Sequence, residues 1–213
     1  FNEGLESIAT RAFYGSHLEK VELPASLKNC GSLCFSTVQR VIFNGDTLPK
    51  GFISAITLDE FDSNDGVEAV KVCLKDIDKT IYIPKQMSQI GIETAIFHLE
   101  GCSLAEADTY LFDSAYRFAN VADSAFLAAM EECFTNNNEE AKEFLKKNST
   151  RIVDKLLEEE DESGLERISR LGVVSEEQLK RIGELAERKE WAALSAYVMN
   201  QVDNSDDDDV FSL

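Results

Sequence analysis

The side chains best suited to acid–base or metal chemistry at neutral pH are few in this chain and far apart. His17 and His98 are its two histidines. Neither lies in an H-x-x-x-H, H-E-x-x-H or C-x-x-C-H context, so metal or haem ligation has no support. Catalysis needs partner groups that converge on such a residue, and the sequence shows none around either histidine. His17 directly precedes an apolar stretch, and we expect it to lie in an exposed turn.

The cysteines also lack the spacing of a reactive or ligating set. There are five of them: Cys30, Cys34, Cys73, Cys102 and Cys133. The C-x-x-x-C spacing of Cys30 and Cys34 differs from the C-x-x-C of redox and zinc sites, and no second pair exists to complete a tetrahedral site. Spacing alone would allow a nucleophile pair of Cys102 and His98, but no basic cluster lowers the pKa of that thiol. We expect Cys30 and Cys34 to be buried, unreactive thiols.

Other motifs for metals, phosphates or acyl transfer are absent or incomplete. The segment 62–66 (Asp-Ser-Asn-Asp-Gly) has the composition of a calcium-binding loop. Its ligand spacing is wrong, and Cys73 stands where a bidentate Glu would be needed, so we expect a turn. No G-x-x-x-x-G-K, G-x-G-x-x-G or G-x-S-x-G sequence occurs. These observations predict a protein that is not an enzyme and holds no metal or cofactor.

The charge of the chain argues against two kinds of partner. It has 213 residues with 21 Lys and Arg against 40 Asp and Glu, a net charge of −19. Residues 1–100 contribute −5 and residues 101–213 contribute −14. A strongly acidic chain repels nucleic acid and anionic membrane surfaces, and no apolar run approaches the ~18 to 20 residues that span a bilayer.

The odd number of cysteines favours a reducing compartment, so we expect a cytoplasmic location, with the cell surface or secretion as the alternative.

Residues 1–100 contain an internal repeat. The segment 21–31 (VELPASLKNCG) recurs as 81–91 (IYIPKQMSQIG), and 8–13 matches 30–35. The strand pattern L-x-x-L-x-L occurs three times, at residues 18–23, 38–43 and 67–72. Pro24 and Pro84 come directly after two of the strands. Because Pro lacks a backbone N–H, it ends the hydrogen-bonded ladder there. Units of roughly 20 to 23 residues of this kind stack into a solenoid with parallel strands on one face.

These residues resemble the BspA-like leucine-rich repeats, whose units read as a strand, I/L-P, S-L or S-V, I-G and A-F. The resemblance rests on residues 21–27 together with Ala12 and Phe13, and on residues 81–84 together with Ile90 and Gly91. The resemblance covers residues 3–97 and implies stacked coils with Phe13 and Phe35 in the interior. Cys30 replaces the Ile of the pattern and Cys34 its Ala. Since the chain starts with Phe1 part-way through a unit, we expect the C-terminal coils of a longer array. Residues 44–66 fit poorly and are expected to form a degenerate coil with an insertion.

The rest of the chain is expected to be helical. From Ser103 the apolar period changes from 2 to 3.6. Helices are predicted at 104–119, 122–134, 138–147, 149–160, 163–171, 175–188 and 190–202, with Ser163 and Ser175 among the N-caps. The first two are expected to cover the open end of the last coil. Within 149–202 helix pairs recur about every 30 residues and resemble ankyrin-type hairpins, although the T-P-L-H turn signature is missing. We expect a disordered acidic tail at 204–213.

The fold class predicted is therefore α/β: a leucine-rich-repeat solenoid fragment over 1–100, then an all-α helical-hairpin domain over 101–203. The candidate site is the strand face, whose outward side chains should form two ladders, one of Lys20, Arg40, Ala69 and Thr80 and one of Glu22, Ile42, Lys71 and Tyr82. Ile42 and Tyr82 would be exposed anchors. This predicts a non-enzymatic module that binds a protein partner. Two alternatives stay open: a surface or secreted adhesin of the same repeat class, and the regulatory arm of an enzyme whose catalytic part lies upstream.

Overall fold

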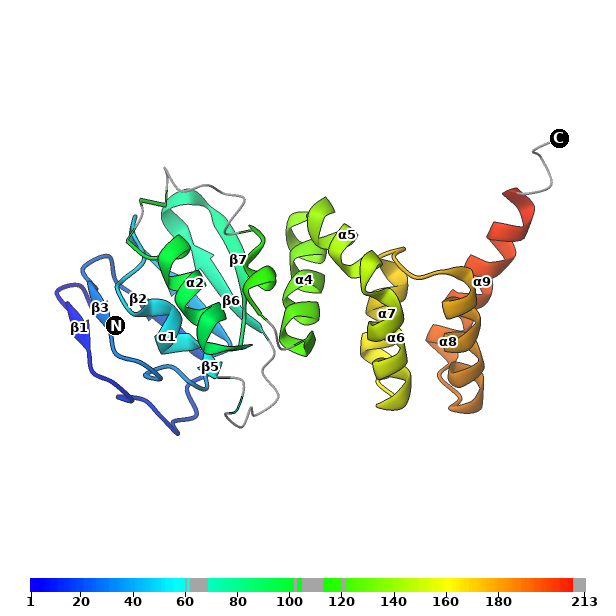
Figure 1. The fold of residues 1–213 in the computed structure, drawn as a ribbon, viewed down its shortest axis with the longest axis horizontal. Coiled ribbons are helices and arrows are strands. Elements are labelled where there is room, and N and C mark those ends of the chain that lie inside the picture. The colour runs from blue at the N-terminus through cyan, green and yellow to red at the C-terminus, as the bar shows by residue number, and fades with distance from the viewer. Residues whose placement is uncertain (60, 62–68, 102, 105–112, 120–121, 209–213) are drawn as a thin grey trace. The chain divides into compact units, whose positions relative to one another are not determined.

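The structure is a computed structural model that describes the whole chain except residues 60, 62–68, 102, 105–112, 120–121 and 209–213. It has a mixed α/β fold in two compact units, Phe1–Asn138 and Glu139–Leu213. The first unit holds small, mostly parallel sheets with helices, and the second is helical (Figure 1). We expected the division near residue 100. The structure instead groups residues 101–138 with the sheets, because helix α4 packs against the last strand of the largest sheet.

The described residues of the first unit contain three sheets. The four-stranded sheet has the order β2-β4-β6-β7, and the pairs β1-β3 and β5-β8 form two small sheets beside it. The bounds are β1 Ser7–Ile8, β2 Lys20–Leu23, β3 Asn29–Cys30, β4 Arg40–Phe43, β5 Leu58–Asp59, β6 Ala69–Leu74, β7 Lys79–Pro84 and β8 Gln86–Met87. Every pair is parallel except β6-β7.

Parallel pairing connects positions about one sequence repeat apart. Ser7 pairs with Asn29, and Lys20 pairs with Arg40. The poorly fitting stretch 44–66 adds the next parallel contact, since Lys50 forms a bridge with Asn29. One expectation is wrong. The segment 81–91 resembles 21–31, but its strand β7 runs antiparallel to β6, as a hairpin partner and not as another parallel coil.

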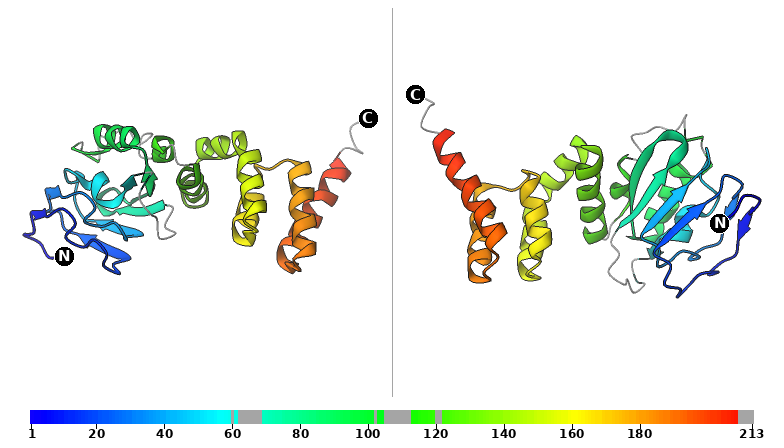
Figure 2. Two further views of the ribbon diagram at one scale, coloured as in Figure 1. Left: turned by 60° about the horizontal axis from the view of Figure 1, so that its bottom comes forward. Right: turned by 180° about the vertical axis from the view of Figure 1, so that it is seen from behind.

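The core of the first unit lies between the inner face of the sheet and two helices, α1 (Phe52–Ile56) and α2 (Gln89–Leu99). Figures 1 and 2 show both helices on the same side of the four-stranded sheet. Phe35 is fully buried in this core and stacks on Phe13 at 5.7 Å between ring centroids. Both helices precede Ser103, where we expected helical structure to begin. Much of the helix predicted at 104–119 lies outside the described residues (105–112), and the described end of it contains the short 3-10 helix η2 (Ala115–Phe118). A second 3-10 turn, η1, covers Lys75–Ile77.

The remaining helices follow the predicted positions closely. They are α4 (Ala122–Asn136), α5 (Glu139–Lys147), α6 (Ser149–Glu158), α7 (Glu162–Arg170), α8 (Glu176–Arg188) and α9 (Ala192–Asp208). Ser175 forms the expected capping box with Gln178, whereas Asp161 and not Ser163 caps α7. The backbone of α9 continues to Asp208, into the stretch 204–213 for which we expected a disordered acidic tail, and 209–213 lie outside the described residues.

The second unit uses one turn geometry twice. Glu160 lies in the turn that follows α6 and has φ 54°, and Glu190 lies in the turn that follows α8 and has φ 60°. The following N–H groups donate to equivalent carbonyls, Asp161 to Leu156 at 3.0 Å and Trp191 to Ala186 at 2.9 Å. Helix α7 packs on α6, and α9 packs on α8. The two helix pairs are therefore built on the same hairpin plan.

Within the described part of the chain, no helix combines the length and the apolar character that crossing a bilayer requires.

Candidate functional site

The outward face of the four-stranded sheet groups the predicted ladder residues in a register that the sequence did not reveal. Lys20, Arg40, Lys71 and Tyr82 are direct neighbours along β2, β4, β6 and β7. The expected ladders placed Ala69 and Thr80 beside Arg40, and Lys71 beside Ile42; both assignments are wrong. The register of β6 is shifted, because the chain between β4 and β6 is longer than one repeat.

Three cations therefore stand side by side, and we call Lys20, Arg40 and Lys71 the cationic row. Neighbouring strands lie ~4.8 Å apart, so the row spans ~10 Å. Lys20 and Arg40 are exposed and Lys71 is half-buried, with its Nζ 5.6 Å from the centroid of the Tyr82 ring. Like charges directly opposite one another destabilise a sheet. Among the described residues, none of the three forms a salt bridge with a carboxylate, so the row is left without a neutralising ion pair.

The next row differs from the predicted one in composition and exposure. It consists of Glu22, Ile42, Cys73 and Thr80. The Lys75 side chain, which follows β6, reaches Glu22 on β2 at 2.7 Å, although β4 lies between these two strands. Ile42, beside Glu22 on β4, is only 9% exposed. Lys75 and Asn44 hold the pKa of Glu22 below its usual value. Ile42 is therefore not the exposed anchor that we expected.

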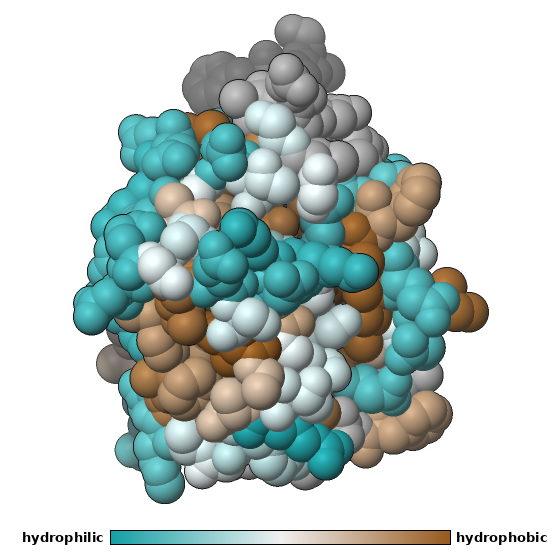
Figure 3. Space-filling model, turned by 90° about the vertical axis from the view of Figure 1, so that its left-hand side faces the viewer, coloured by the Kyte–Doolittle hydropathy of each residue, from teal (hydrophilic) through white to brown (hydrophobic). Residues whose placement is uncertain are grey.

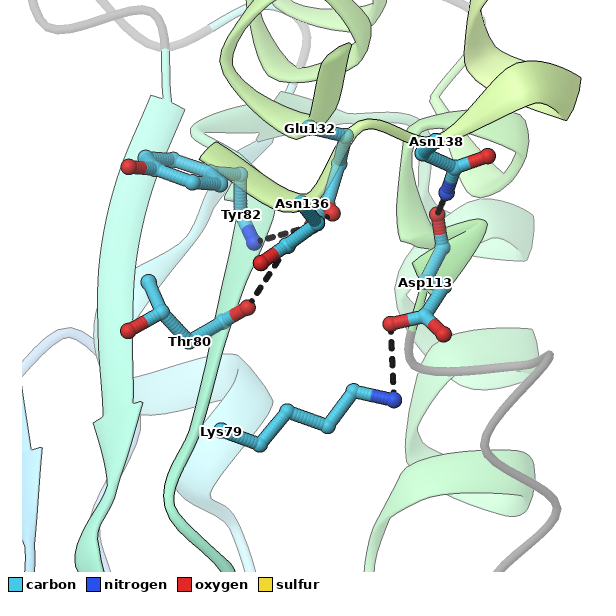
Figure 4. Close-up of polar contacts among 7 residues, drawn as sticks. All are labelled: Lys79, Thr80, Tyr82, Asp113, Glu132, Asn136 and Asn138. Carbon is cyan, nitrogen blue, oxygen red and sulfur yellow. Dashed lines mark hydrogen bonds and ion pairs between the residues drawn. The ribbon is translucent and has the colours of Figure 1, made fainter. Parts of the chain in front are cut away.

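Tyr82 is not an exposed anchor either, being 4% exposed. Its hydroxyl lies 2.8 Å from Thr135 Oγ1 on α4. Its backbone N–H donates to Glu132 Oε1 at 2.8 Å (Figure 4). Asn136 Nδ2 donates to the carbonyl of Thr80 at 2.8 Å. The outer edge of β7 is thus paired with side chains of a helix.

The spacing of these contacts follows from the geometry of helix and strand. Glu132 and Asn136 are one helical turn apart, ~6 Å along α4, and their targets Tyr82 and Thr80 are two strand positions apart, ~6.7 Å along β7. Ser124 Oγ, two turns earlier in α4, accepts the N–H of Gln86 at 3.2 Å. Helix α4 therefore supplies hydrogen bonds that a further strand would otherwise make, and it closes this edge of the sheet.

The carboxylate that makes these contacts is itself buried. Glu132 is fully buried, and burial raises its pKa to about 7, against the lowering effect of the bonds from Asn136 and Tyr82. The Lys79 Nζ pairs with Asp113 Oδ1 at 2.8 Å nearby, and Asn138 Nδ2 donates to the Asp113 carbonyl (Figure 4). Both carboxylate oxygens of Glu132 are engaged by backbone or amide donors, so the group serves to join helix and strand.

A second buried charge joins segments that are distant in the sequence. Lys85 is fully buried, and its Nζ donates to the carbonyls of Ile56 at 2.8 Å and Val38 at 3.2 Å. Burial lowers the pKa of this ammonium to about 7. Neither Lys85 nor Glu132 was identified from the sequence. Only Glu132 carried a usable signal, as a carboxylate one turn before Asn136 on a face that otherwise packs apolar residues.

The remaining chemistry-bearing residues take structural positions. Cys30 and Cys34 are buried as expected, and the hydrogen bond between them, together with burial, raises the pKa of Cys30. His17 is exposed, as predicted. His98 stacks on Phe118 at 6.0 Å. The calcium-like segment 62–66 and Cys102 lie outside the described residues. Over the residues that are described, no three His, Cys, Asp or Glu side chains gather as a metal site would need.

The end of the first unit opposite to α4 is not covered in the same way. Figure 3 faces this end and shows apolar side chains among polar ones. In the N-terminal segment of the first unit, Phe1 and Tyr14 are exposed, and Leu5, Phe13 and Leu18 are only partly buried. The N-terminal ammonium of Phe1 donates to the carbonyl of Glu22 on the edge strand β2 at 2.9 Å.

Comparison of the chain with models of known protein families, with characterised proteins and with solved structures finds no match in any of the three.

Proposed function

We propose that the first unit is a leucine-rich-repeat-type module that binds a protein partner and performs no reaction. Its fold class is supported by parallel pairing between positions about one repeat apart and by the stacking of Phe13 on Phe35, its counterpart one repeat later. The helical unit, on this proposal, is an ankyrin-like array of hairpins. Its support is the turn shared by Glu160 and Glu190.

The observation that carries the proposal is the cationic row. A chain with a net charge of −19 places three cations on adjacent strands, on the one face of the sheet that faces away from the core. An acidic segment of a partner would neutralise the row and relieve the repulsion within it. The partner class is therefore an acidic stretch of polypeptide, bound in extended form across β2, β4 and β6.

The test uses the whole chain and a synthetic peptide rich in Glu, with a Lys-rich peptide of equal length for comparison. The variant Lys20→Glu/Arg40→Glu/Lys71→Glu should weaken binding of the acidic peptide more than tenfold, as measured by titration calorimetry. A matched variant, Lys142→Glu/Lys146→Glu/Lys147→Glu, changes the net charge equally in the helical unit and should leave the affinity unchanged. Equal losses in the two variants, or preference for the Lys-rich peptide, would refute the proposal.

The proposal includes a reducing, cytoplasmic location. Cys30, Cys34, Cys73 and Cys133 are thiols in the structure. Titration of protein prepared from its native cells without reductant should find these thiols free. A disulfide among them would favour the surface alternative.

A further inference from the structure

Helix α2 exposes two large apolar side chains on the side that faces away from the core, beside the polar Gln89 and Glu93. Ile92, Ala95 and Leu99 are buried against the sheet, whereas Ile90 is 76% and Phe97 79% exposed. A surface helix normally carries polar residues on its outer face. Ile90 and Phe97 lie two helical turns apart, with Thr94 between them at one turn from Ile90. This i, i+4, i+7 spacing is the one by which helices are recognised.

The outer face of α2 is held in place before any partner arrives. Ser88 caps the helix by accepting the N–H of Gly91, and Gly91 lies so close to the chain that a Cβ there would be 2.2 Å from the Phe118 carbonyl oxygen. The Phe97 ring meets His98 edge-on at 5.0 Å, and His98 stacks on Phe118. An anchor that is already oriented loses less conformational entropy on binding.

We infer that the exposed face of α2 is a docking surface for an amphipathic helix that carries Lys or Arg beside its apolar stripe. Ile90 and Phe97 together expose on the order of 300 Å² of apolar side chain. That is well short of the ~800 Å² per partner of a stable protein dimer, which disfavours a second copy of the chain. An amphipathic helix that binds in a groove uses a few apolar anchors of this kind.

The charge beside the two anchors selects the type of helix. Glu93 is exposed between Ile90 and Phe97 and accepts a hydrogen bond from Gln89 Nε2 at 2.9 Å. Glu100 is engaged elsewhere, since it accepts the N–H groups of Gly51 and Ile53 at 2.8 Å. Helix α2 contains no Lys or Arg. Glu93 is therefore the exposed ionised side chain that α2 itself presents beside the two anchors, and a basic flank on the partner complements it. This surface lies across the core from the cationic row, so the inference does not depend on the proposed function.

The test measures binding of two synthetic amphipathic helices to the full chain by fluorescence anisotropy, one built from Leu and Lys and one from Leu and Glu in the same pattern. The Leu/Lys helix should bind, and Ile90→Ser/Phe97→Ser should weaken it at least tenfold. Glu93→Lys should weaken it severalfold and improve binding of the Leu/Glu helix. The variant Met199→Ser, which removes an exposed apolar residue from α9, should have no effect.

Several results would overturn the inference. Binding that survives in Ile90→Ser/Phe97→Ser and disappears in about 0.5 M salt would be non-specific attraction to an acidic protein. Equal binding of the two helices would exclude selection by charge. Self-association of the unmodified chain that Phe97→Ser abolishes would identify a second copy as the occupant. Because both anchors are exposed, the variants should keep the circular dichroism of the unmodified chain, and a changed spectrum would show that Ile90 and Phe97 are structural residues.

Discussion

Glu132 accepts the backbone N–H of Tyr82 across the boundary between a helix and the edge of a sheet, with 2.8 Å between the two atoms. Side chains rarely take the place of a neighbouring strand, and here Asn136 continues the substitution at Thr80. The arrangement fixes α4 in register along β7. It also makes the stability of the first unit sensitive to pH.

The first prediction concerns Glu132. Burial raises its pKa from 4.5 to about 7, so the folded state binds the proton more tightly than the unfolded state. Its contribution to stability is therefore largest below about pH 4.5 and is lost as the pH rises to about 7, by up to ~3 kcal/mol. Glu132→Gln should remove this dependence. The protection of the Tyr82 amide against hydrogen exchange, compared with the unmodified chain at pH 5 and pH 8, measures it. Trp191 fluorescence reports the helical unit and should not respond.

The second prediction concerns Lys85, whose pKa burial lowers from 10.5 to about 7. Here the folded state binds the proton less tightly, so stability rises between about pH 7 and pH 10.5, by up to ~5 kcal/mol. Lys85→Met avoids burying a charge but leaves two carbonyls without their donor, at a cost of ~1 to 3 kcal/mol. The variant should be the more stable protein at pH 6 and the less stable one at pH 10. Urea unfolding at both values tests this, and parallel pH profiles of the two proteins would contradict it.

The third prediction tests repulsion within the cationic row. Arg40→Gln should raise stability by ~0.5 kcal/mol at low salt, because Arg40 stands between Lys20 and Lys71. The gain should vanish in about 0.5 M salt. Arg181→Gln is the control with the opposite sign, because Arg181 pairs with Asp154 at 2.7 Å. A destabilised Arg40→Gln would mean that the row is compensated by charges beyond its neighbours.

The fourth prediction addresses the close approach of the first two repeat segments. Gly31 donates its N–H to Ile8, and a Cβ on Gly31 would lie 2.1 Å from the backbone nitrogen of Thr10. Backbone atoms cannot yield as a side chain can. Gly31→Ala should therefore cost ~2 to 3 kcal/mol. Ser32→Ala, at the exposed neighbour, should be nearly neutral in the same thermal unfolding experiment. A neutral Gly31→Ala would mean that the two segments do not approach so closely.

The fifth prediction uses the turn that recurs in the helical unit. Glu160 and Glu190 both adopt a left-handed conformation, with φ 54° and 60°, that costs a residue other than Gly ~1 kcal/mol. Glu190→Gly should stabilise the unit by ~0.5 to 1 kcal/mol, read from Trp191 fluorescence during unfolding. Glu160→Gly should gain less, because it also removes the ion pair with Lys189. A loss of stability in Glu190→Gly would show that the Glu side chain has a role in the turn.

The sequence predicted helix positions and buried residues well where a periodic apolar pattern coincided with a local interaction such as a helix cap. The helices from α5 to α9 begin near the predicted residues because their caps and apolar periods are local properties. The expected burial of Cys30 and Cys34 is confirmed, since each stands at an apolar position of the repeat. Helix α2 was missed because its apolar residues lie on both sides of the helix and give no single stripe.

The register of the outward face of the four-stranded sheet could not be predicted in the same way. It depends on the offset between β4 and β6, which the irregular stretch between these strands sets. A shift by two positions preserves the alternation of inward and outward side chains, so the apolar pattern is equally consistent with either register. The burial of Tyr82 depends on α4, which lies far from it in the sequence. Such long-range contacts leave no signature in a local sequence pattern. For that reason the sequence did not reveal that Ile42 and Tyr82, the two expected anchors, are buried.

The shared turn of Glu160 and Glu190 bears on how the chain reaches its native state. Each hairpin of the helical unit closes over a short turn, whereas every parallel pair in the first unit must join segments that a whole repeat or more separates. Closing a long loop costs chain entropy before the stabilising contacts have formed, and this slows folding. The helical hairpins should thus form quickly and by themselves, while the sheets assemble later, and α4 can dock only after β7 has paired with β6.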